Sequence, residues 1–328
     1  MKVQDFAIKA CRKIYRVICR PNFVNLPCEY DRNTANMLIL NLLNSDQPCM
    51  ISRYGTIEID IVTNYLTAHS NQTLMRRCIN FIMDDTGLPW WDKKIFKSMH
   101  LNAGIFPENI DTLDSFSKRY LKDTLEIDIL GSYTYKEKFM PLPQHTKYVH
   151  LECLYPFWAD TPWTKVLEGK KVLVVHPFTE TISSQYKNRE RLFKDTRILP
   201  KYELKLLKAV QSNAGADTPF KTWEEALNHM EKQISNIDFD ICIIGCGAYG
   251  LPLAAHVKRI GKKAIHLGGG SQLLWGIKGK RWDNNAYHWK ELPQLYTNYS
   301  SLYNDYWVRP SAKETPSQAS NVENACYW

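Results

Sequence analysis

The sequence has no apolar run long enough to cross a bilayer. The longest uncharged stretch, residues 241–257, contains three glycines, a proline and a histidine, and it is shorter than the roughly 20 apolar residues that span a membrane. The first 20 residues carry a charge every few positions, so they lack the apolar core of a secretory signal. We therefore expect a cytoplasmic protein.

Several catalytic and metal-binding motifs are also missing. There is no Ser-His-Asp order, no His-Glu-x-x-His, no Walker loop, no zinc-ligand spacing and no Cys-x-x-Cys. Hydrolase, metalloprotease and nucleotide-triphosphatase functions therefore have no support. The nine cysteines are scattered along the chain, which is typical of reduced, mostly buried thiols.

The composition is that of a folded protein. Of 328 residues, 44% are hydrophobic and 23% are charged, and this length fits one large or two small domains. The net charge of +8 suits anionic partners such as phosphates or anionic lipid. Nothing beyond this charge indicates nucleic-acid binding, and we expect none.

The first 21 residues form a basic, amphipathic segment. Six basic residues stand against Asp5 alone, and apolar residues recur at helical spacing at Val3, Phe6, Ala10, Ile14 and Val17. Such a stripe predicts a helix, which Pro21 ends. Two interpretations remain open: residues 1–20 lie on a membrane surface, or the helix docks on the protein's own core.

The rest of the chain alternates strands and helices. Apolar runs predict strands at 49–52, 127–130, 148–154, 171–176, 202–210, 239–244 and 263–267. Helices are expected at 31–43, 222–236 and 249–260, among others. The alternation predicts an α/β fold, with a Rossmann-like, mostly parallel, doubly wound sheet and helices on both faces.

We divide the chain into the basic helix 1–21, an N-terminal α/β part 22–165, a Rossmann-like part 166–290 and an extension 291–328. The two α/β parts can form one continuous domain. Residues 311–321 are polar and are expected to form a loose tail, although Cys326-Tyr327-Trp328 can fold back onto the body.

A G-x-G-x-x-G turn follows the 239–244 strand, and it supplies Gly245, Gly247, Tyr249 and Gly250 as candidate phosphate-binding residues. Backbone N–H groups in such a turn can reach a phosphate. A nicotinamide enzyme would show Asp or Glu at the end of the next strand, where this chain has His266 and Leu267. Three interpretations stay open: glycines that only permit close packing, nicotinamide binding, and nucleotide or phosphate binding.

Two further strand ends offer phosphate ligands. A glycine-rich loop after the 263–267 strand contributes Gly269 and then three cations, Lys278, Lys280 and Arg281. The 171–176 strand ends at His176, and Thr179 follows it. The alternatives are a solvated basic loop and a threonine that only caps a helix.

Three carboxylates are candidate catalytic bases. Glu58 lies in the turn Arg53-Tyr54-Gly55-Thr56-Ile57-Glu58, whereas Asp128 and Glu152 stand inside apolar runs. Buried carboxylates are costly without a partner, and one in a cleft can take a proton. Alternatively, Glu58 pairs with Arg53, and the other two lie on the solvent faces of strands.

These motifs, in this order, resemble the GT-D class of bacterial glycosyltransferases. The turn 53–58 is similar to that family's Arg-x-Gly-Asp-Gly-Glu element. Residues 169–178 resemble its Gly-Lys-Lys strand that ends in Pro-Phe, and 239–268 resemble its late strand, turn and helix. The resemblance covers roughly residues 45–285 and implies donor contacts at Arg53, Gly55 and Thr56.

The resemblance implies an inverting, hexosyltransferase-like enzyme. It would move a sugar from a nucleotide-sugar co-substrate to a glycan or lipid-linked acceptor in bacterial surface-polysaccharide biosynthesis, at the inner face of the cytoplasmic membrane. The family pairs Asp-x-Glu with Mn²⁺ or Mg²⁺. Here Glu58 is kept but Thr56 replaces the Asp, so Glu58 is the one candidate metal ligand and cations can replace the metal. The alternatives are an NAD(P)-dependent oxidoreductase using Gly245–Gly250 and a noncatalytic nucleotide-binding protein.

Overall fold

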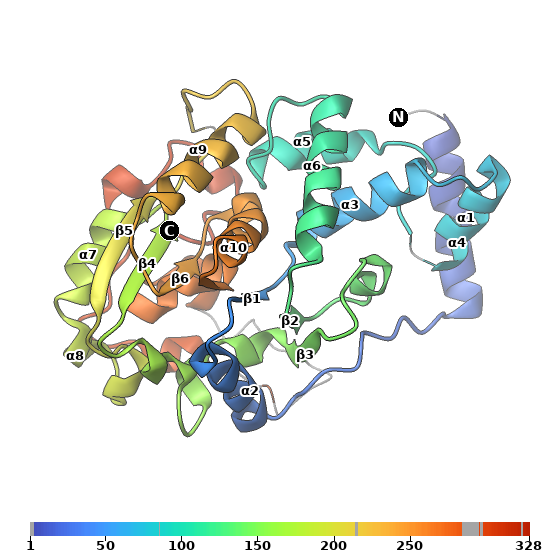
Figure 1. Cartoon of the computed structure of the whole chain (residues 1–328). Helices are drawn as coiled ribbons and strands as arrows, with labels where there is room; N and C mark the ends of the chain where they lie inside the picture. Colours follow the sequence, from blue (N-terminus) through green and yellow to red (C-terminus); the bar gives the residue numbers. More distant parts are fainter. Residues whose placement is uncertain (1–2, 85, 214–215, 284–294, 296–297, 323) are drawn as a thin grey trace.

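The computed structural model describes residues 3–84, 86–213, 216–283, 295, 298–322 and 324–328. Its strands form one seven-stranded parallel sheet in the order β3-β2-β1-β7-β6-β4-β5 (Figure 1). The strands are β1 (Cys49–Ser52), β2 (Ile129–Ser132), β3 (Lys147–His150), β4 (Lys171–His176), β5 (Glu203–Lys208), β6 (Ile241–Ile244) and β7 (Lys263–His266). The predicted α/β, Rossmann-like fold is confirmed.

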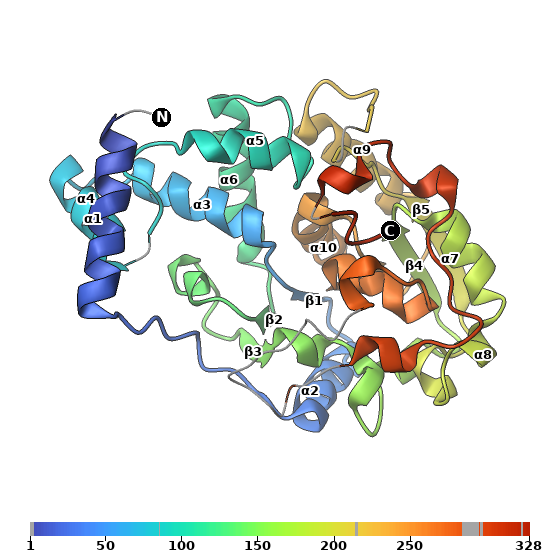
Figure 2. The ribbon, with the colours of Figure 1, turned by 180° about the vertical axis from the view of Figure 1, so that it is seen from behind.

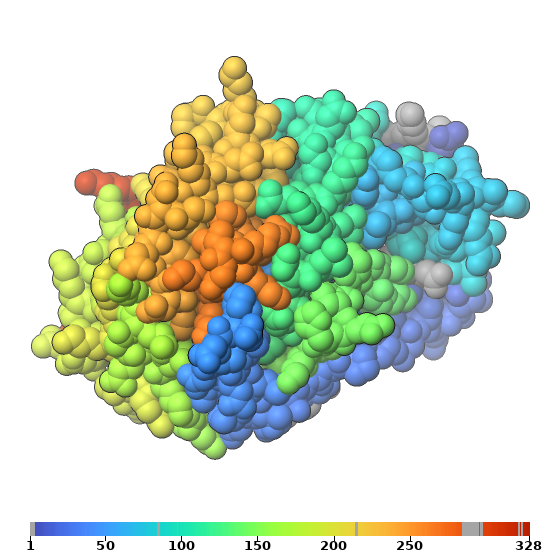
Figure 3. Space-filling view, viewed as in Figure 1, coloured from blue at the N-terminus to red at the C-terminus, as the bar shows by residue number. Residues whose placement is uncertain are grey.

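Helices cover both faces of this sheet. They are α1 (Val3–Cys19), α2 (Arg32–Asn44), α3 (Thr56–Ala68), α4 (Leu74–Asp84), α5 (Lys93–Leu101), α6 (Ile110–Thr124), α7 (Thr179–Tyr186), α8 (Arg189–Leu192), α9 (Trp223–Ser235) and α10 (Gly250–Arg259). Figure 3 shows α10 between α6 and α9 on one face. Figure 2, from behind, shows α2 and the C-terminal segments on the other.

Alternation along each strand produces these two faces. Val172 and Val174 of β4 belong to one apolar cluster together with α2 and α7, whereas Leu173 and Val175 belong to a second cluster with α3, α6, α9 and α10. Successive strand side chains point to opposite faces. A strand buried on both faces is therefore apolar through its middle, as β4 is at Val172–Val175.

The two α/β parts predicted from the sequence share this one sheet. β1 of the first part pairs with β7 of the second, with Ile51 opposite Ile265. The predicted boundary between residues 290 and 291 lies outside the described residues. Most predicted strands match to within two residues, but 148–154 was wrong in its second half. There the His150 side chain accepts a hydrogen bond from the Glu152 N–H at 3.2 Å and opens a 3-10 turn, η2 (Leu151–Leu154).

The predicted loose tail at 311–321 is also wrong. Glu314 is buried, and its carboxylate accepts hydrogen bonds from the N–H groups of Glu180 (2.7 Å) and Thr181 (3.2 Å). These N–H groups belong to the first turn of α7, whose N-cap residue Phe178 provides no side-chain acceptor. A carboxylate at a helix N-terminus satisfies unpaired donors and the helix dipole together, so this contact holds the tail.

The N-terminal helix α1 packs beside α4 at one end of the molecule (Figures 1 and 2). Ile8 forms a small apolar cluster with Phe81 and Leu88, and the Trp90 indole donates a hydrogen bond of 2.6 Å to Asp5. None of the helices in the described ranges has the length and hydropathy that crossing a bilayer requires.

The role of Glu314 is testable by substitution. Glu314→Ala removes the acceptor of two backbone N–H groups, and we expect it to lower the free energy of unfolding by about 2 kcal/mol. Urea denaturation measures this loss. Glu190→Ala, at an exposed carboxylate of α8, is the control. Equal stability of the two variants would mean that Glu314 does not hold the tail.

Candidate functional site

A cleft of about 360 Å³ lies where four neighbouring strands end. Its walls follow the carboxyl ends of β1, β7, β6 and β4, which is where parallel α/β sheets bind ligands. The cleft brings together the predicted base Glu58 and most of the predicted donor-binding residues: Arg53, Gly55, Thr56, His176, Gly245, Gly247, Tyr249, Gly269 and Arg281.

Arg53, directly after β1, supplies a largely buried positive charge. Its Nε is buried without a hydrogen-bond partner among the described residues, and its Cζ lies 5.2 Å from the ring centroid of Tyr133. Burial opposes the charge, but neighbouring groups that include Glu58 outweigh it and hold the pKa of Arg53 above its usual value. A buried cation of this kind favours an anionic ligand.

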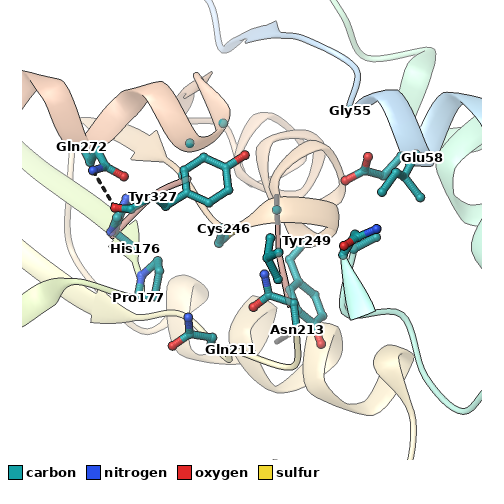
Figure 4. A pocket seen from close by; sticks show the side chains of 18 of the residues that line it. Gly55, Glu58, His176, Pro177, Gln211, Asn213, Cys246, Tyr249, Gln272 and Tyr327 are labelled. Atoms are coloured by element: carbon teal, nitrogen blue, oxygen red, sulfur yellow. Dashed lines mark hydrogen bonds between the residues drawn. The ribbon is translucent and has the colours of Figure 1, made fainter. Parts of the chain in front are cut away.

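Glu58 projects into the cleft from the first turn of α3 (Figure 4). It is 8% exposed. A Cβ on Gly55 would lie 1.8 Å from its Oε2, so the carboxylate folds over the start of its own helix. Asp60, two residues on, forms an ion pair with Lys136 and is 42% exposed, because residues two apart on a helix diverge.

Two helix starts face the cleft without a side-chain cap. Gly55 precedes α3, and Cys246 precedes the 3-10 turn η6 (Gly247–Tyr249) that leads into α10. Gly247 has a φ of +58°, with nothing within 4 Å of a Cβ built on it. Gly250 instead lies against His266, since a Cβ there would be 2.2 Å from the ring Nε2. The motif therefore combines close packing with an open turn suited to phosphate.

Two buried histidines line the cleft as neutral groups. Burial lowers the pKa of both His176 and His266 to about 3. The Phe178 N–H donates to His176 Nδ1 at 3.0 Å, so His176 Nε2 carries the hydrogen and can donate. His266 Nδ1 lies 3.1 Å from the Ser52 hydroxyl. Neither ring can act as a cation near neutral pH.

The C-terminal residues cover one side of the cleft. Tyr327 packs against Gly269, and its hydroxyl accepts a 3.1 Å hydrogen bond from Arg281. Gln272 Nε2 donates to the Tyr327 carbonyl at 3.1 Å (Figure 4). Sequence reasoning foresaw that 326–328 could fold back but did not assign Tyr327, Gln272, Tyr133 or His266 to the site. No local motif marks them.

Two predicted catalytic carboxylates lie elsewhere. Asp128 stands before β2, at the amino ends of the strands, where it accepts a hydrogen bond from the Met50 N–H and pairs with Lys258, each at 2.8 Å. Glu152 is buried and accepts a hydrogen bond from the Tyr299 hydroxyl. Because each has a structural partner outside the cleft, the structure does not bring either carboxylate to the site.

Four predicted phosphate ligands also lie outside the lining of the cleft, and one of them is Gly250, which packs against His266. Thr179 begins α7, whose N-terminus Glu314 occupies. Lys278 lies 5.3 Å from the Tyr303 ring centroid, and Lys280 is exposed. Of the three cations in the basic loop, Arg281 is the one that lines the cleft.

The side chains of the cleft do not fit a divalent-metal site. Within the described ranges no three His, Cys, Asp or Glu residues are grouped as metal ligands, and Glu58 is the one carboxylate among the residues that line the cleft. The Thr56 hydroxyl lies 3.2 Å from the Tyr133 hydroxyl. Divalent cations of the Mg²⁺ type prefer several oxygen ligands, which this set does not offer.

Comparisons with known proteins yield two structural matches of low similarity. No family model matches the chain, and no curated protein does. Among solved structures, a selenomethionine-substituted domain of unknown function 1792 matches at 14% identity and a TM-score of 0.34, covering 89% of this chain and 94% of its own. A second structure of domain of unknown function 1792 is described as having a distinct glycosyltransferase fold. It matches at 14% sequence identity and a TM-score of 0.34, and the match covers 95% of this chain and 98% of that structure's chain. Such values do not assign a function.

The buried histidines predict a pH-dependent stability. Their pKa is about 3 when folded and near 6.5 when exposed, so between these values the unfolded chain binds protons that the folded chain does not. The free energy of unfolding should therefore fall as pH falls, by up to about 1.4 kcal/mol per pH unit for each histidine.

Urea denaturation at pH 7 and pH 5 measures this slope. His176→Gln/His266→Gln should flatten it, whereas His145→Gln, at a largely exposed histidine, should not. An unchanged slope in the double variant would contradict the assignment of neutral, buried rings.

Proposed function

We propose that this protein is a glycosyltransferase that moves a sugar from a nucleotide-sugar donor to an acceptor hydroxyl. The observation that carries the proposal is the position of Arg53 and Glu58 in one cleft. A half-buried cation that favours an anion and a buried carboxylate line the same space at the strand ends. The sequence resemblance at residues 53–58 supports the same activity.

The donor diphosphate would bind between Arg53, Arg281 and the uncapped starts of α3 and η6. When the bond from the sugar to the diphosphate breaks, negative charge grows on the leaving oxygen. Donors fixed by the fold stabilise this charge without having to reorganise. The neutral His176 can donate one further hydrogen bond from Nε2, and this role does not depend on its protonation.

Glu58 is the proposed base. Its carboxylate would take the proton of the acceptor hydroxyl as that oxygen attacks the anomeric carbon. The new carbon–oxygen bond forms as the bond to the diphosphate breaks, and the diphosphate leaves with the electron pair. A single displacement of this kind inverts the anomeric configuration, as the family resemblance implies.

The finer assignments belong to the same proposal. We infer a hexosyl donor, a glycan or lipid-linked acceptor, and a role in bacterial surface-polysaccharide biosynthesis on the cytoplasmic side. Since the cleft lacks a multidentate carboxylate set, Arg53 and Arg281 would meet the diphosphate charge in place of Mn²⁺ or Mg²⁺. Transfer would then persist in the presence of a chelator.

The oxidoreductase alternative has weaker support in the cleft. A nicotinamide dinucleotide needs a carboxylate for its ribose at the end of the strand after the glycine turn. Here β7 ends at His266, which packs against Gly250. A noncatalytic nucleotide-binding protein needs the Arg53 cation but not the Glu58 carboxylate. A requirement for Glu58 would therefore distinguish a transferase from such a protein.

A thermal-shift screen tests the ligand class. We expect stabilisation by a nucleoside diphosphate and one nucleotide sugar, unchanged by EDTA, because a ligand at a hundred times its dissociation constant adds about 2.7 kcal/mol. Arg53→Met should abolish the shift, and Arg76→Met, at an exposed arginine of α4, is the control. A thermal shift with NAD(P) alone would contradict the proposal. A shift with a nucleotide sugar that EDTA abolishes would contradict the metal-free form of the proposal.

Substitution of Glu58 tests the chemistry. Glu58→Gln keeps the shape of the side chain, so we expect donor binding to persist and transfer to fall by 10²-fold or more, as loss of a general base does. Asp60→Asn, two residues away on the same helix and outside the cleft lining, is the matched control. Full activity of Glu58→Gln would remove Glu58 from the mechanism, and donor binding without turnover in the native protein would favour a noncatalytic role.

A further inference from the structure

Helix α1 uses its less apolar face to contact the rest of the protein. Ile8 is buried against Phe81 and Leu88, Asp5 accepts a hydrogen bond from Trp90, and the Arg12 guanidinium lies 4.5 Å from the Phe81 ring centroid. Lys9 pairs with Asp92 at 2.8 Å. The contacts that hold α1 are thus largely polar, which is unusual for an amphipathic helix on a protein core.

The apolar stripe of α1 is instead exposed. The exposed fractions are 63% for Phe6, 58% for Ile14, 66% for Val17 and 73% for Ile18. At 100° per residue these four side chains lie on one side of the helix, opposite Ile8. The docked-helix interpretation accounts for the polar side of α1 but leaves this side without a partner among the described residues.

The neighbouring helix α4 adds a second exposed stripe. Met75, Ile79 and Met83 recur every four residues and are 75%, 37% and 45% exposed. α1 and α4 lie side by side at the end of the molecule away from β5 (Figures 1 and 2). Exposed apolar side chains concentrated in this way mark a site of interaction.

A basic cavity adjoins the apolar stripe of α1. It has a volume of about 560 Å³ and lies between α1 and α3. Among the side chains that the structure describes, five cations and two carboxylates line it: Lys9, Arg12, Lys13, Arg16, Lys136, Asp60 and Asp92. Two ion pairs, Lys9 with Asp92 and Lys136 with Asp60, lie among these side chains, and Lys13 and Arg16 of the same lining are exposed. Val17 belongs both to the lining and to the exposed stripe, so the two features meet.

We propose that α1 docks this protein on an anionic lipid bilayer. The exposed stripe enters the boundary between headgroups and acyl chains, and the cavity receives the phosphate of an anionic lipid. Exposed apolar side chains beside exposed basic side chains match this surface in both respects. A second copy of the chain fits less well, because a two-fold contact through α1 would bring the cationic rims together. The proposal does not depend on which reaction the cleft carries.

Vesicle flotation of the full chain tests the docking. We expect binding to vesicles of phosphatidylcholine with phosphatidylglycerol, weak binding to phosphatidylcholine alone, and release by high salt. Ile14→Glu/Ile18→Glu should weaken binding by about tenfold or more. The control is Ile110→Glu/Leu125→Glu, at side chains exposed by 51% and 53% elsewhere. All four positions are exposed, so the variants should fold, and circular dichroism checks this.

A second pair of variants tests the cavity. Lys13→Gln/Arg16→Gln should remove most of the preference for anionic vesicles, whereas Lys118→Gln/Lys122→Gln on α6 should not. Three outcomes would overturn the proposal. All variants could float equally, the protein could show no preference for anionic lipid, or inorganic phosphate could compete with vesicle binding as well as anionic vesicles do. Self-association that Ile14→Glu/Ile18→Glu abolishes, in sedimentation without lipid, would assign the surface to a second copy.

Discussion

The pairing of β1 with β7 is the contact on which the cleft depends. These strands come from opposite halves of the chain, and their register sets Ile51 beside Ile265. Because both run in the same direction, the residues that follow them meet at one edge of the sheet. Arg53 consequently reaches Gly268, where its Nη1 would lie 3.1 Å from a Cβ. Without this pairing the buried cation would have no enclosed space to occupy.

The helix N-termini at the carboxyl edge of the sheet differ in whether a side chain of the protein caps them. The start of α7 is occupied by the chain's own carboxylate, Glu314, although it follows β4 at the same edge of the sheet. The starts of α3 and η6 have no side-chain cap and face the cleft. An uncapped helix start has N–H donors and a partial positive charge that an anion can satisfy. The fold therefore closes the start of α7 with its own carboxylate, whereas the starts of α3 and η6 lie in the wall of the cleft.

Part of the candidate site was predictable from the sequence because it follows strands, although Tyr133 and His266, which also stand at strand ends, were not assigned to it. Arg53, Glu58, His176 and the turn 245–250 were found because each stands at the end of an apolar run, and the carboxyl ends of parallel strands converge. Asp128 and Glu152 also stand beside apolar runs, yet they lie outside the cleft. Their partners, Lys258 and Tyr299, are more than a hundred residues away, and no local pattern shows such partners.

The sequence by itself determined most of the strands, their alternation with helices and the parallel α/β class. These follow from local properties, namely apolar runs and the period at which apolar residues recur on a helix. The tertiary structure alone decided which side of α1 faces solvent, that Glu314 caps α7, and that Tyr327 joins Arg281 beside Gly269. These features depend on contacts between distant segments, and the position of such contacts is set only when the sheet and its covering helices pack together.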